Sequence, residues 1–265
     1  MSTLTRADAA TLAYDRRGSG PTLVLLHPLG ADRHVWAPVI GRLAEQRDVI
    51  ALDLPGFGDS PVLDGGGEPP TPRALAAAVA SFLDGLGLAG SAHVAGNSLG
   101  GWVALELALA GHARSVTAIA PAGLWPEPLA PKRGLAQVLA KAVLPVLPAL
   151  VRSARGRRIA LAGSIADPER VPPEAALRLV RAYAQAPGFA DVNAAMRAGR
   201  FTQLHEIRVP VTFGWPEHDR LVARPRKLPR GVRSVVLPGA GHLPMWDAPE
   251  LVAALLLKGS GGFVA

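Results

Sequence analysis

One short segment of the sequence has the composition expected of a serine nucleophile. Residues 96–100 read Gly-Asn-Ser-Leu-Gly, and they follow a short apolar run and precede a helical pattern. A Gly-x-Ser-x-Gly sequence between a strand and a helix is typical of a tight turn that lifts the serine hydroxyl out of a sheet. The alternative is a glycine-rich turn with an incidental serine. The flanking strand and helix favour Ser98 as a nucleophile, with the N–H of Leu99 facing the developing oxyanion.

A serine hydroxyl needs a base, and the base needs a third group that orients it. His242 lies in the run Gly-Ala-Gly-His-Leu-Pro at 239–244, directly after the last expected strand. Asp219 follows the preceding expected strand, and Glu217 is a competing carboxylate in the same loop. Asp219 could instead be a helix N-cap, and His242 a solvated loop histidine. The chain order serine, acid, histidine matches one known class of serine hydrolases, so we predict that Ser98, Asp219 and His242 form a triad.

A second oxyanion donor is expected in the turn His27-Pro28-Leu29-Gly30, which follows the first core strand. Proline has no N–H, so the backbone N–H of Leu29 is the candidate donor. We expect His27 itself to hold the shape of this turn. A plain strand-to-helix turn is the alternative interpretation.

The elements around these residues alternate short apolar runs with longer helical patterns, which predicts parallel strands joined by helices. The expected strands are 22–26, 49–52, 93–96, 115–119, 209–213 and 233–237, and the expected helices include 36–43, 72–86, 102–110 and 249–258. The strand pattern stops between residues 122 and 206, and a structureless loop of that length is improbable in a compact domain. We therefore predict a helical insertion at 122–206 between the two parts of a core domain, 1–121 and 207–265.

Together these segments resemble the α/β-hydrolase fold family over essentially the whole chain. The resemblance is carried by residues 27–30, 53–60, 96–101, 214–219 and 241–250, in that family's order. It implies an α/β fold with a doubly wound, mostly parallel sheet of the eight-stranded type and a helical cap inserted after strand 6. It also implies the catalytic residues Ser98, Asp219 and His242, the oxyanion donors Leu29 and Leu99, and no cofactor.

Some positions depart from the pattern of that family. Pro28 stands where a glycine usually follows the histidine, and Pro216 stands where a glycine usually follows the tryptophan before the acid. Members that open epoxides or remove halogens carry an aspartate at the elbow, so Ser98 argues against both reactions. Carbon–carbon bond hydrolases share Gly-Asn-Ser-x-Gly-Gly, but their oxyanion turn resembles His-Gly-x-Gly-Pro-Gly, which residues 27–32 do not follow.

The function that these features predict is hydrolysis of a carboxylic ester, thioester or lactone of a small to medium, mostly apolar substrate through an acyl-enzyme. Trp125, Leu129 and Tyr183 could line the substrate pocket beneath the cap, and packing inside the cap is their alternative role. The alternatives for function are a carbon–carbon bond hydrolase, a cofactor-free perhydrolase, and a non-hydrolytic biosynthetic enzyme or small-molecule receptor that uses the same pocket.

Composition excludes several other kinds of protein. The chain of 265 residues has no cysteine, which excludes disulfides, thiolate metal sites and a cysteine nucleophile. The net charge of +7 lies between residues 122 and 200, which hold 12 Lys and Arg against five Asp and Glu. No aromatic residue is interleaved in the basic run, so we expect no nucleic-acid partner. The seven histidines show no metal-ligand spacing, so we expect no metal site.

Hydropathy provides an expectation about membranes. The first twenty residues hold no apolar core of a signal peptide. The most apolar stretch, residues 134–151, is interrupted by Lys141 and two prolines and falls short of the roughly 20 apolar residues that span a bilayer. We expect a cytoplasmic protein with a small-molecule substrate and no membrane partner. Many relatives in the family dimerise, which leaves a homodimer open.

Overall fold

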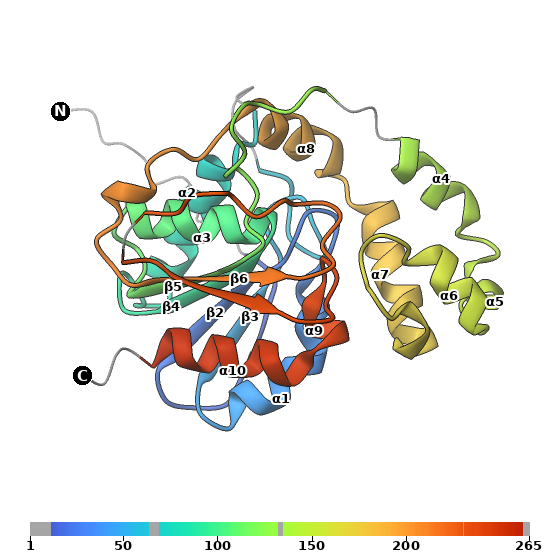
Figure 1. The fold of residues 1–265 in the computed structure, drawn as a ribbon, viewed down its shortest axis with the longest axis horizontal. Helices are drawn as coiled ribbons and strands as arrows, with labels where there is room; N and C mark the ends of the chain where they lie inside the picture. Colours follow the sequence, from blue (N-terminus) through green and yellow to red (C-terminus); the bar gives the residue numbers. More distant parts are fainter. Residues whose placement is uncertain (1–11, 64–68, 132–134, 230, 262–265) are drawn as a thin grey trace.

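The centre of the molecule is a twisted sheet flanked by helices on both faces (Figure 1). The computed structural model describes residues 12–63, 69–131, 135–229 and 231–261. These ranges hold seven strands in the order β1-β3-β2-β4-β5-β6-β7, and only β1 is antiparallel to its neighbour. The strands are β1 (Tyr14–Arg17), β2 (Thr22–Leu26), β3 (Asp48–Leu52), β4 (His93–Asn97), β5 (Ser115–Ile119), β6 (Val211–Pro216) and β7 (Arg233–Leu237). The predicted α/β class with a doubly wound, mostly parallel sheet is confirmed.

The sheet differs from the expectation in three details. The described ranges hold seven strands, whereas the resemblance implies a sheet of the eight-stranded type. The sequence does not predict β1, because all four of its residues are exposed and show no apolar alternation. It is fixed by pairing with β3 and by Arg16, which donates to Asp48 at 2.7 and 2.8 Å. β6 begins at Val211 and runs to Pro216, so Trp215 lies in the strand rather than in the following loop.

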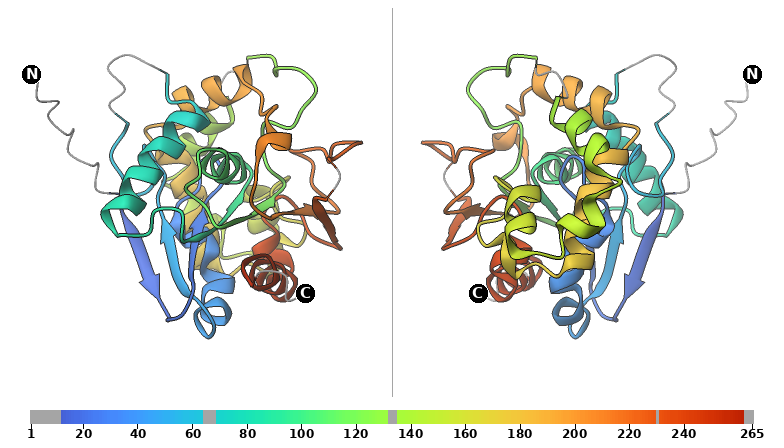
Figure 2. Two further views of the ribbon diagram at one scale, coloured as in Figure 1. Left: turned by 90° about the vertical axis from the view of Figure 1, so that its left-hand side faces the viewer. Right: turned by 90° about the vertical axis from the view of Figure 1, so that its right-hand side faces the viewer.

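Helices cover the sheet in two layers (Figure 2). One face packs against α1 (Ala37–Ala44) and α10 (Pro249–Ser260), and the other against α2 (Pro72–Gly85) and α3 (Leu99–Leu109). Every residue of β3, β4 and β5 is buried, as expected of parallel strands covered on both faces. The two apolar cores therefore hold the strand ends, and the turns that follow them, in fixed positions.

A helical segment separates β5 from β6 along the chain. Its helices are α4 (Leu135–Val143), α5 (Leu147–Leu150), α6 (Ala154–Ala160), α7 (Pro173–Gln185) and α8 (Phe189–Ala198), with short 3₁₀ turns at Pro168–Arg170 and Leu204–Glu206. In Figure 1, α4–α7 stand on the side toward which the arrowheads of β6 and β7 point. The segment therefore faces the carboxyl edge of the sheet. Within the ranges that the structure describes, no helix is both long enough and apolar enough to cross a bilayer.

Candidate active site

Ser98 occupies a strained turn between β4 and α3. Its backbone has φ of 55° and ψ of −114°, a left-handed conformation that is rare for a residue with a side chain. A Cβ at Gly96 would overlap the carbonyl oxygen of Gly100, and a Cβ at Gly100 would overlap the carbonyl oxygen of Leu26. Both glycines are therefore required by the close approach of neighbouring backbone. The turn has the geometry of a nucleophile elbow.

The end of β5 holds this turn in place. The N–H of Ser98 donates to the carbonyl of Ile119 at 2.9 Å, and the N–H of Ala122 donates to the carbonyl of Ser98 at 3.0 Å. Ala120, which lies between Ile119 and Ala122 in the chain, also has a positive φ, of 40°. Leu99 is the first residue of α3, where a helix leaves the N–H without an intrahelical acceptor. That N–H is therefore available to a negatively charged group beside Ser98.

His242 and Asp219 form a buried hydrogen-bonded pair. His242 Nδ1 lies 2.7 Å from Asp219 Oδ2, and the side chains are 6% and 3% exposed respectively. The other carboxylate oxygen accepts the N–H of Leu221 at 2.7 Å and the N–H of Val222 at 3.0 Å. An ionised carboxylate can only accept, so Nδ1 carries the proton and Nε2 is left as an acceptor. Asp219 thus caps a tight turn and orients the imidazole at the same time.

The electrostatics of Asp219 favour the ionised carboxylate. Burial alone would raise its pKa, but the hydrogen bond and charge of His242 and the N–H groups of Val222 and Leu221 outweigh burial. The pKa of Asp219 is lowered as a result. The carboxylate is therefore charged at neutral pH, where it can stabilise an imidazolium.

The three residues come from neighbouring parts of one sheet edge. Ser98 follows β4, Asp219 follows β6 and His242 follows β7, and these strands are parallel. Within the described residues no hydrogen bond joins the Ser98 hydroxyl to His242. Catalytic hydrogen bonds of this kind are often long without substrate and tighten when substrate binds. The competing carboxylate, Glu217, accepts instead from the N–H of Gly239 at 2.8 Å.

The turn that follows β2 is anchored by a buried histidine. His27 Nδ1 donates to the carbonyl of Pro28 at 2.8 Å, and His27 Nε2 accepts the N–H of Leu54 at 2.9 Å. Burial lowers the pKa of His27 and so favours the neutral ring that this pair of bonds requires. The N–H of Ala31 closes the turn on the carbonyl of Pro28 at 3.1 Å. No hydrogen bond within the described residues occupies the N–H of Leu29.

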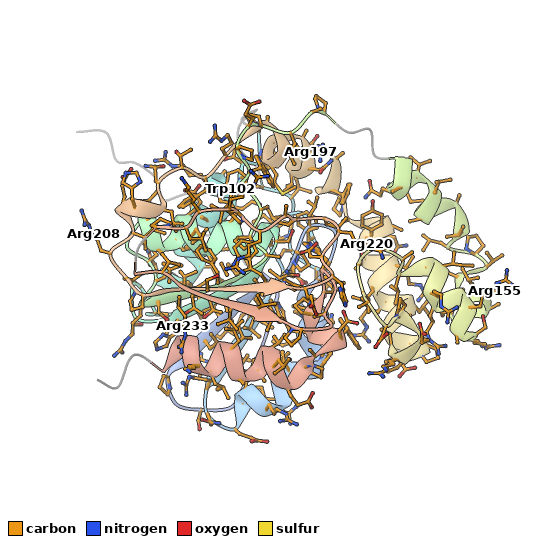
Figure 3. The ribbon with its side chains drawn as sticks, in the orientation of Figure 1. Trp102, Arg155, Arg197, Arg208, Arg220 and Arg233 are labelled. Atoms are coloured by element: carbon orange, nitrogen blue, oxygen red, sulfur yellow. The ribbon has the colours of Figure 1, made fainter. Side chains whose placement is uncertain are left out.

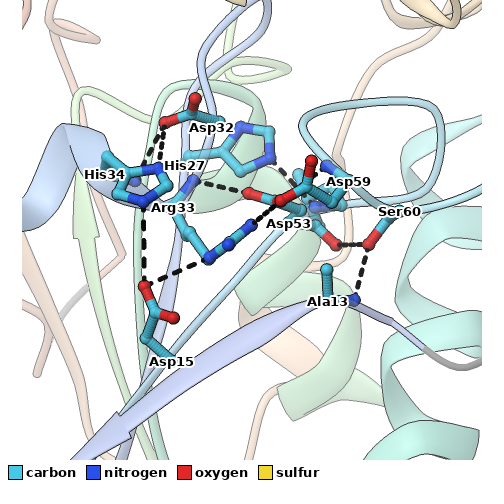
Figure 4. A network of polar contacts seen from close by, with 10 residues as sticks. Ala13, Asp15, His27, Asp32, Arg33, His34, Asp53, Asp59 and Ser60 are labelled. Atoms are coloured by element: carbon cyan, nitrogen blue, oxygen red, sulfur yellow. Dashed lines mark hydrogen bonds and ion pairs between the residues drawn. The ribbon is translucent and has the colours of Figure 1, made fainter. Parts of the chain in front are cut away.

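A second buried carboxylate ties this turn to the loop after β3 (Figure 4). Asp53 is fully buried and accepts the backbone N–H of Arg33 at 2.6 Å, its guanidinium, and the N–H of Asp59 at 2.9 Å. The Ser60 hydroxyl donates to the carbonyl of Asp53 at 2.8 Å and accepts the N–H of Ala13 at 2.9 Å. The run 53–60 is therefore a structural support for the turn that presents Leu29.

Asp247 is a positioning residue that the sequence analysis missed. Its carboxylate accepts the N–H of Gly241 at 2.8 Å, next to His242, and those of Ala166 and Asp167 at 2.9–3.0 Å. The same two loops meet again where the N–H of Leu243 donates to the carbonyl of Ser164 at 2.8 Å. Asp247 therefore joins the loop of His242 to the loop after α6. The only sequence signal is an aspartate a few residues beyond the histidine.

The three candidate pocket residues have different surroundings. Leu129 lines a largely apolar cavity of about 520 Å³ together with Phe189 of α8. Tyr183 does not line that cavity, but its ring contacts the ring of Phe189 edge-on, with centroids 4.9 Å apart. A Cβ at Gly30 would lie 2.6 Å from the Tyr183 ring and 3.2 Å from the Phe189 ring, so both rings lie against the turn after β2.

Trp125, the third candidate, serves internal packing in this structure. It stacks edge-on against Trp102 of α3 with centroids 5.8 Å apart, and its indole N–H donates to the carbonyl of Gly199 at 2.9 Å. These contacts join the segment after β5 to the end of α8.

A second cavity of about 400 Å³ is polar and lies beside the Asp219–His242 pair. It is lined by Arg158 and Glu169 on one side and by His218, Arg220 and Gly241 on the other; Arg220 is labelled in Figure 3. Ser98 lines neither of these two cavities. In the part of the chain that the structure describes, no group of three His, Asp or Glu side chains is placed to hold a metal ion.

The chain is similar to known proteins in sequence and in structure. A family model described as the alpha/beta hydrolase family matches residues 23–255. The epoxide hydrolase EphH of Mycobacterium tuberculosis is 37% identical over 198 residues, which are 69% of this chain and 91% of that protein. A pimeloyl-[acyl-carrier protein] methyl ester esterase of Aeromonas hydrophila is 43% identical over 99 residues, 37% of this chain and 36% of that protein. Among solved structures, a bacterial membrane phospholipase A superposes with a TM-score of 0.72 and 27% identity, covering 96% of this chain and 88% of the other.

Proposed function

Since the chain belongs to the alpha/beta hydrolase family and is a hydrolase of that fold, we propose that it cleaves a carboxylic ester, thioester or lactone through an acyl-enzyme on Ser98. The observation that carries the proposal is the combination of a strained Ser98 at the end of β4 with the buried Asp219–His242 pair at the same sheet edge. An oriented base beside a serine elbow is the arrangement that acyl transfer requires.

The reaction has two halves. Ser98 Oγ attacks the substrate carbonyl while His242 Nε2 takes the hydroxyl proton, and the N–H groups of Leu29 and Leu99 stabilise the tetrahedral oxyanion. The bond from carbon to the leaving oxygen or sulfur then breaks, and His242 returns its proton to the leaving alcohol or thiol. Water, deprotonated by His242, attacks the acyl-enzyme, and collapse of the second tetrahedral species releases the carboxylic acid and restores Ser98.

Ester cleavage is favoured over epoxide opening by the residue at the elbow. One relative is named an epoxide hydrolase. Opening an epoxide in this family depends on an aspartate nucleophile, however, and this chain has Ser98 at that position. A second relative is named a methyl ester esterase. We therefore assign the acyl-transfer reaction to this chain.

The apolar cavity supports a mostly apolar substrate. It is lined by Leu129 and Phe189, and Phe189 contacts the turn that carries the Leu29 donor. An alkyl or aryl group held there would lie against Phe189, whose ring lies close to Gly30 of that turn, and not in the polar cavity at Arg220.

Intact-mass spectrometry after treatment with a fluorophosphonate tests the proposal. We expect one adduct on the wild-type protein and on the control Ser91→Ala, whose hydroxyl is exposed on a surface turn, and none on Ser98→Ala. Hydrolysis of p-nitrophenyl esters of graded chain length should then fall at least about a thousandfold in Ser98→Ala. A folded wild type that forms no adduct and turns over no ester would show that the chain is not a serine hydrolase.

A further inference from the structure

Helix α4 buries a polar side chain and exposes apolar side chains, the reverse of the usual arrangement in an amphipathic helix. Among the α4 residues whose burial is described, the buried one is Gln137, whose side-chain amide donates to the carbonyls of Tyr183 and Ala186 at 3.1 and 3.3 Å. Val138 and Leu139 are instead 62% and 58% exposed, and Val143 is also exposed. A surface helix normally buries its apolar stripe. The apolar face of α4 therefore has no cover within the described residues.

The exposed apolar face continues along the chain. Val146, just before α5, and Ile159 on α6 are each exposed to a similar degree as Val138. The region of residues 136–160, which we call the cap tip, forms one end of the molecule, beyond the carboxyl edge of the sheet (Figure 1). Exposed aliphatic side chains gathered at one end of a molecule mark a surface that binds something.

The cap tip is also strongly basic. Between residues 135 and 160 the sequence has five Lys and Arg and no Asp or Glu. Arg157 is used internally, because its guanidinium donates to the carbonyls of Val151 and Glu169. The side chains of Arg152 and Arg155 are exposed and make no ion pair with any described residue. Figure 3 shows Arg155 at the outer end of this region.

We propose that the cap tip docks on the surface of an anionic phospholipid membrane. Aliphatic side chains beside unpaired cations are suited to an interface where acyl chains lie below anionic headgroups. A second copy of the chain is disfavoured, because it would bring two uncompensated positive surfaces together. A protein partner is disfavoured because the exposed apolar residues are Val, Leu and Ile, whereas protein interfaces are enriched in aromatic anchors.

This inference goes beyond the proposed function and does not depend on it. The expectation of no membrane partner came from the lack of a segment that could span a bilayer. Binding to the membrane surface needs no such segment. The proposal therefore replaces that expectation with peripheral attachment through the cap tip.

Co-sedimentation of the full-length protein with lipid vesicles tests the proposal. We expect binding to vesicles of phosphatidylcholine with phosphatidylglycerol, weakening as salt is raised, and little binding to phosphatidylcholine alone. Arg155→Glu should weaken binding roughly tenfold, whereas the matched reversal Arg208→Glu, at the opposite end in Figure 3, should not. Leu139→Asp should weaken it by a comparable factor, whereas Leu251→Asp on the exposed side of α10 should not.

Circular dichroism shows whether each variant is folded. If Leu139→Asp does not fold, the comparison of Arg155→Glu with Arg208→Glu tests the proposal. Absence of vesicle binding by the wild type would overturn the proposal. Equal binding to neutral and anionic vesicles would overturn it as well, and so would equal losses in the matched control variants. Wild-type dimers that Leu139→Asp dissociates, seen by analytical ultracentrifugation without lipid, would assign the cap tip to a second copy instead.

Discussion

Two buried aspartates lie at the carboxyl edge of the sheet, and their partners differ in kind. Asp53 follows β3 and is held by the guanidinium and backbone N–H of Arg33. Asp219 follows β6 and is held by two backbone N–H groups and by the imidazole of His242. Both carboxylates accept at least three hydrogen bonds. Only the second has a partner with a ring nitrogen that can accept a proton from a neighbouring hydroxyl.

The partner determines what each buried carboxylate can do. Burial would lower the pKa of Arg33, but the surrounding carboxylates Asp59, Asp53 and Asp15 raise it, so this guanidinium is charged at any pH at which the protein is folded. The Asp53–Arg33 pair is consequently a permanent support. The imidazole of His242 can accept a proton at Nε2, and Asp219 can stabilise the cation that results. Variants at the two aspartates separate these roles.

The largest expected effect is on the rate of ester hydrolysis in Asp219→Asn. The asparagine amide can donate to Nδ1, which stabilises the wrong imidazole tautomer and leaves Nε2 unable to accept a proton. We expect kcat to fall by roughly 10⁴, as for the loss of an orienting aspartate in a serine triad. Measurement of kcat and KM with a p-nitrophenyl ester tests this. Glu217→Gln, in the same loop but bonded to Gly239, is the control and should keep its activity. A fall of less than tenfold in Asp219→Asn would contradict the assignment.

The second effect is on stability, in Asp53→Ala. Removing Asp53 leaves the Arg33 guanidinium with only the exposed carboxylates of Asp15 and Asp59, and it leaves the backbone N–H groups of Arg33 and Asp59 without their acceptor. We expect the free energy of unfolding to fall by about 3–5 kcal/mol. Urea denaturation followed by circular dichroism measures it. The control Asp59→Asn alters an exposed carboxylate of the same cluster and should change stability by less than about 1 kcal/mol. Equal losses in the two variants would show that Asp53 is not the centre of the support.

The smallest effect concerns the dependence of stability on acid. The folded-state pKa of Asp219 is lowered, so its contribution to stability is fully present above the unfolded value of about 3.9 and is lost as pH falls through the folded value. Asp219→Asn should therefore lose less stability than the wild type between neutral pH and pH below about 4. Thermal unfolding across this range gives the comparison, with Glu217→Gln again as the control. The prediction would be wrong if the stability of the wild type and of Asp219→Asn fell equally as the pH is lowered.

Much of this site could be predicted from the sequence, because each signal lies within a short segment of the chain. Gly96 and Gly100 surround Ser98, and Asp219 and His242 each follow a parallel strand, so their meeting at one edge follows from the fold class. β1 could not be predicted, because its residues are exposed, show no apolar alternation, and are held by residues distant in the chain, such as Asp48, which accepts from Arg16. Asp247 could not be predicted either, because two of its N–H donors lie 80 and 81 residues earlier in the chain.

The bonds made by Asp247 have a thermodynamic consequence. One carboxylate joins the loop of His242 to the loop after α6, so the positions of the two loops are energetically linked. Such linkage is reciprocal. A first ligand that binds one position of the helices between β5 and β6 more tightly changes the free energy of positioning the imidazole of His242. A second ligand that binds at His242 changes the affinity for the first ligand by the same factor. Binding of a surface at α6 would therefore change the free energy of positioning His242, and a ligand bound at His242 would change the affinity of α6 for that surface by the same factor.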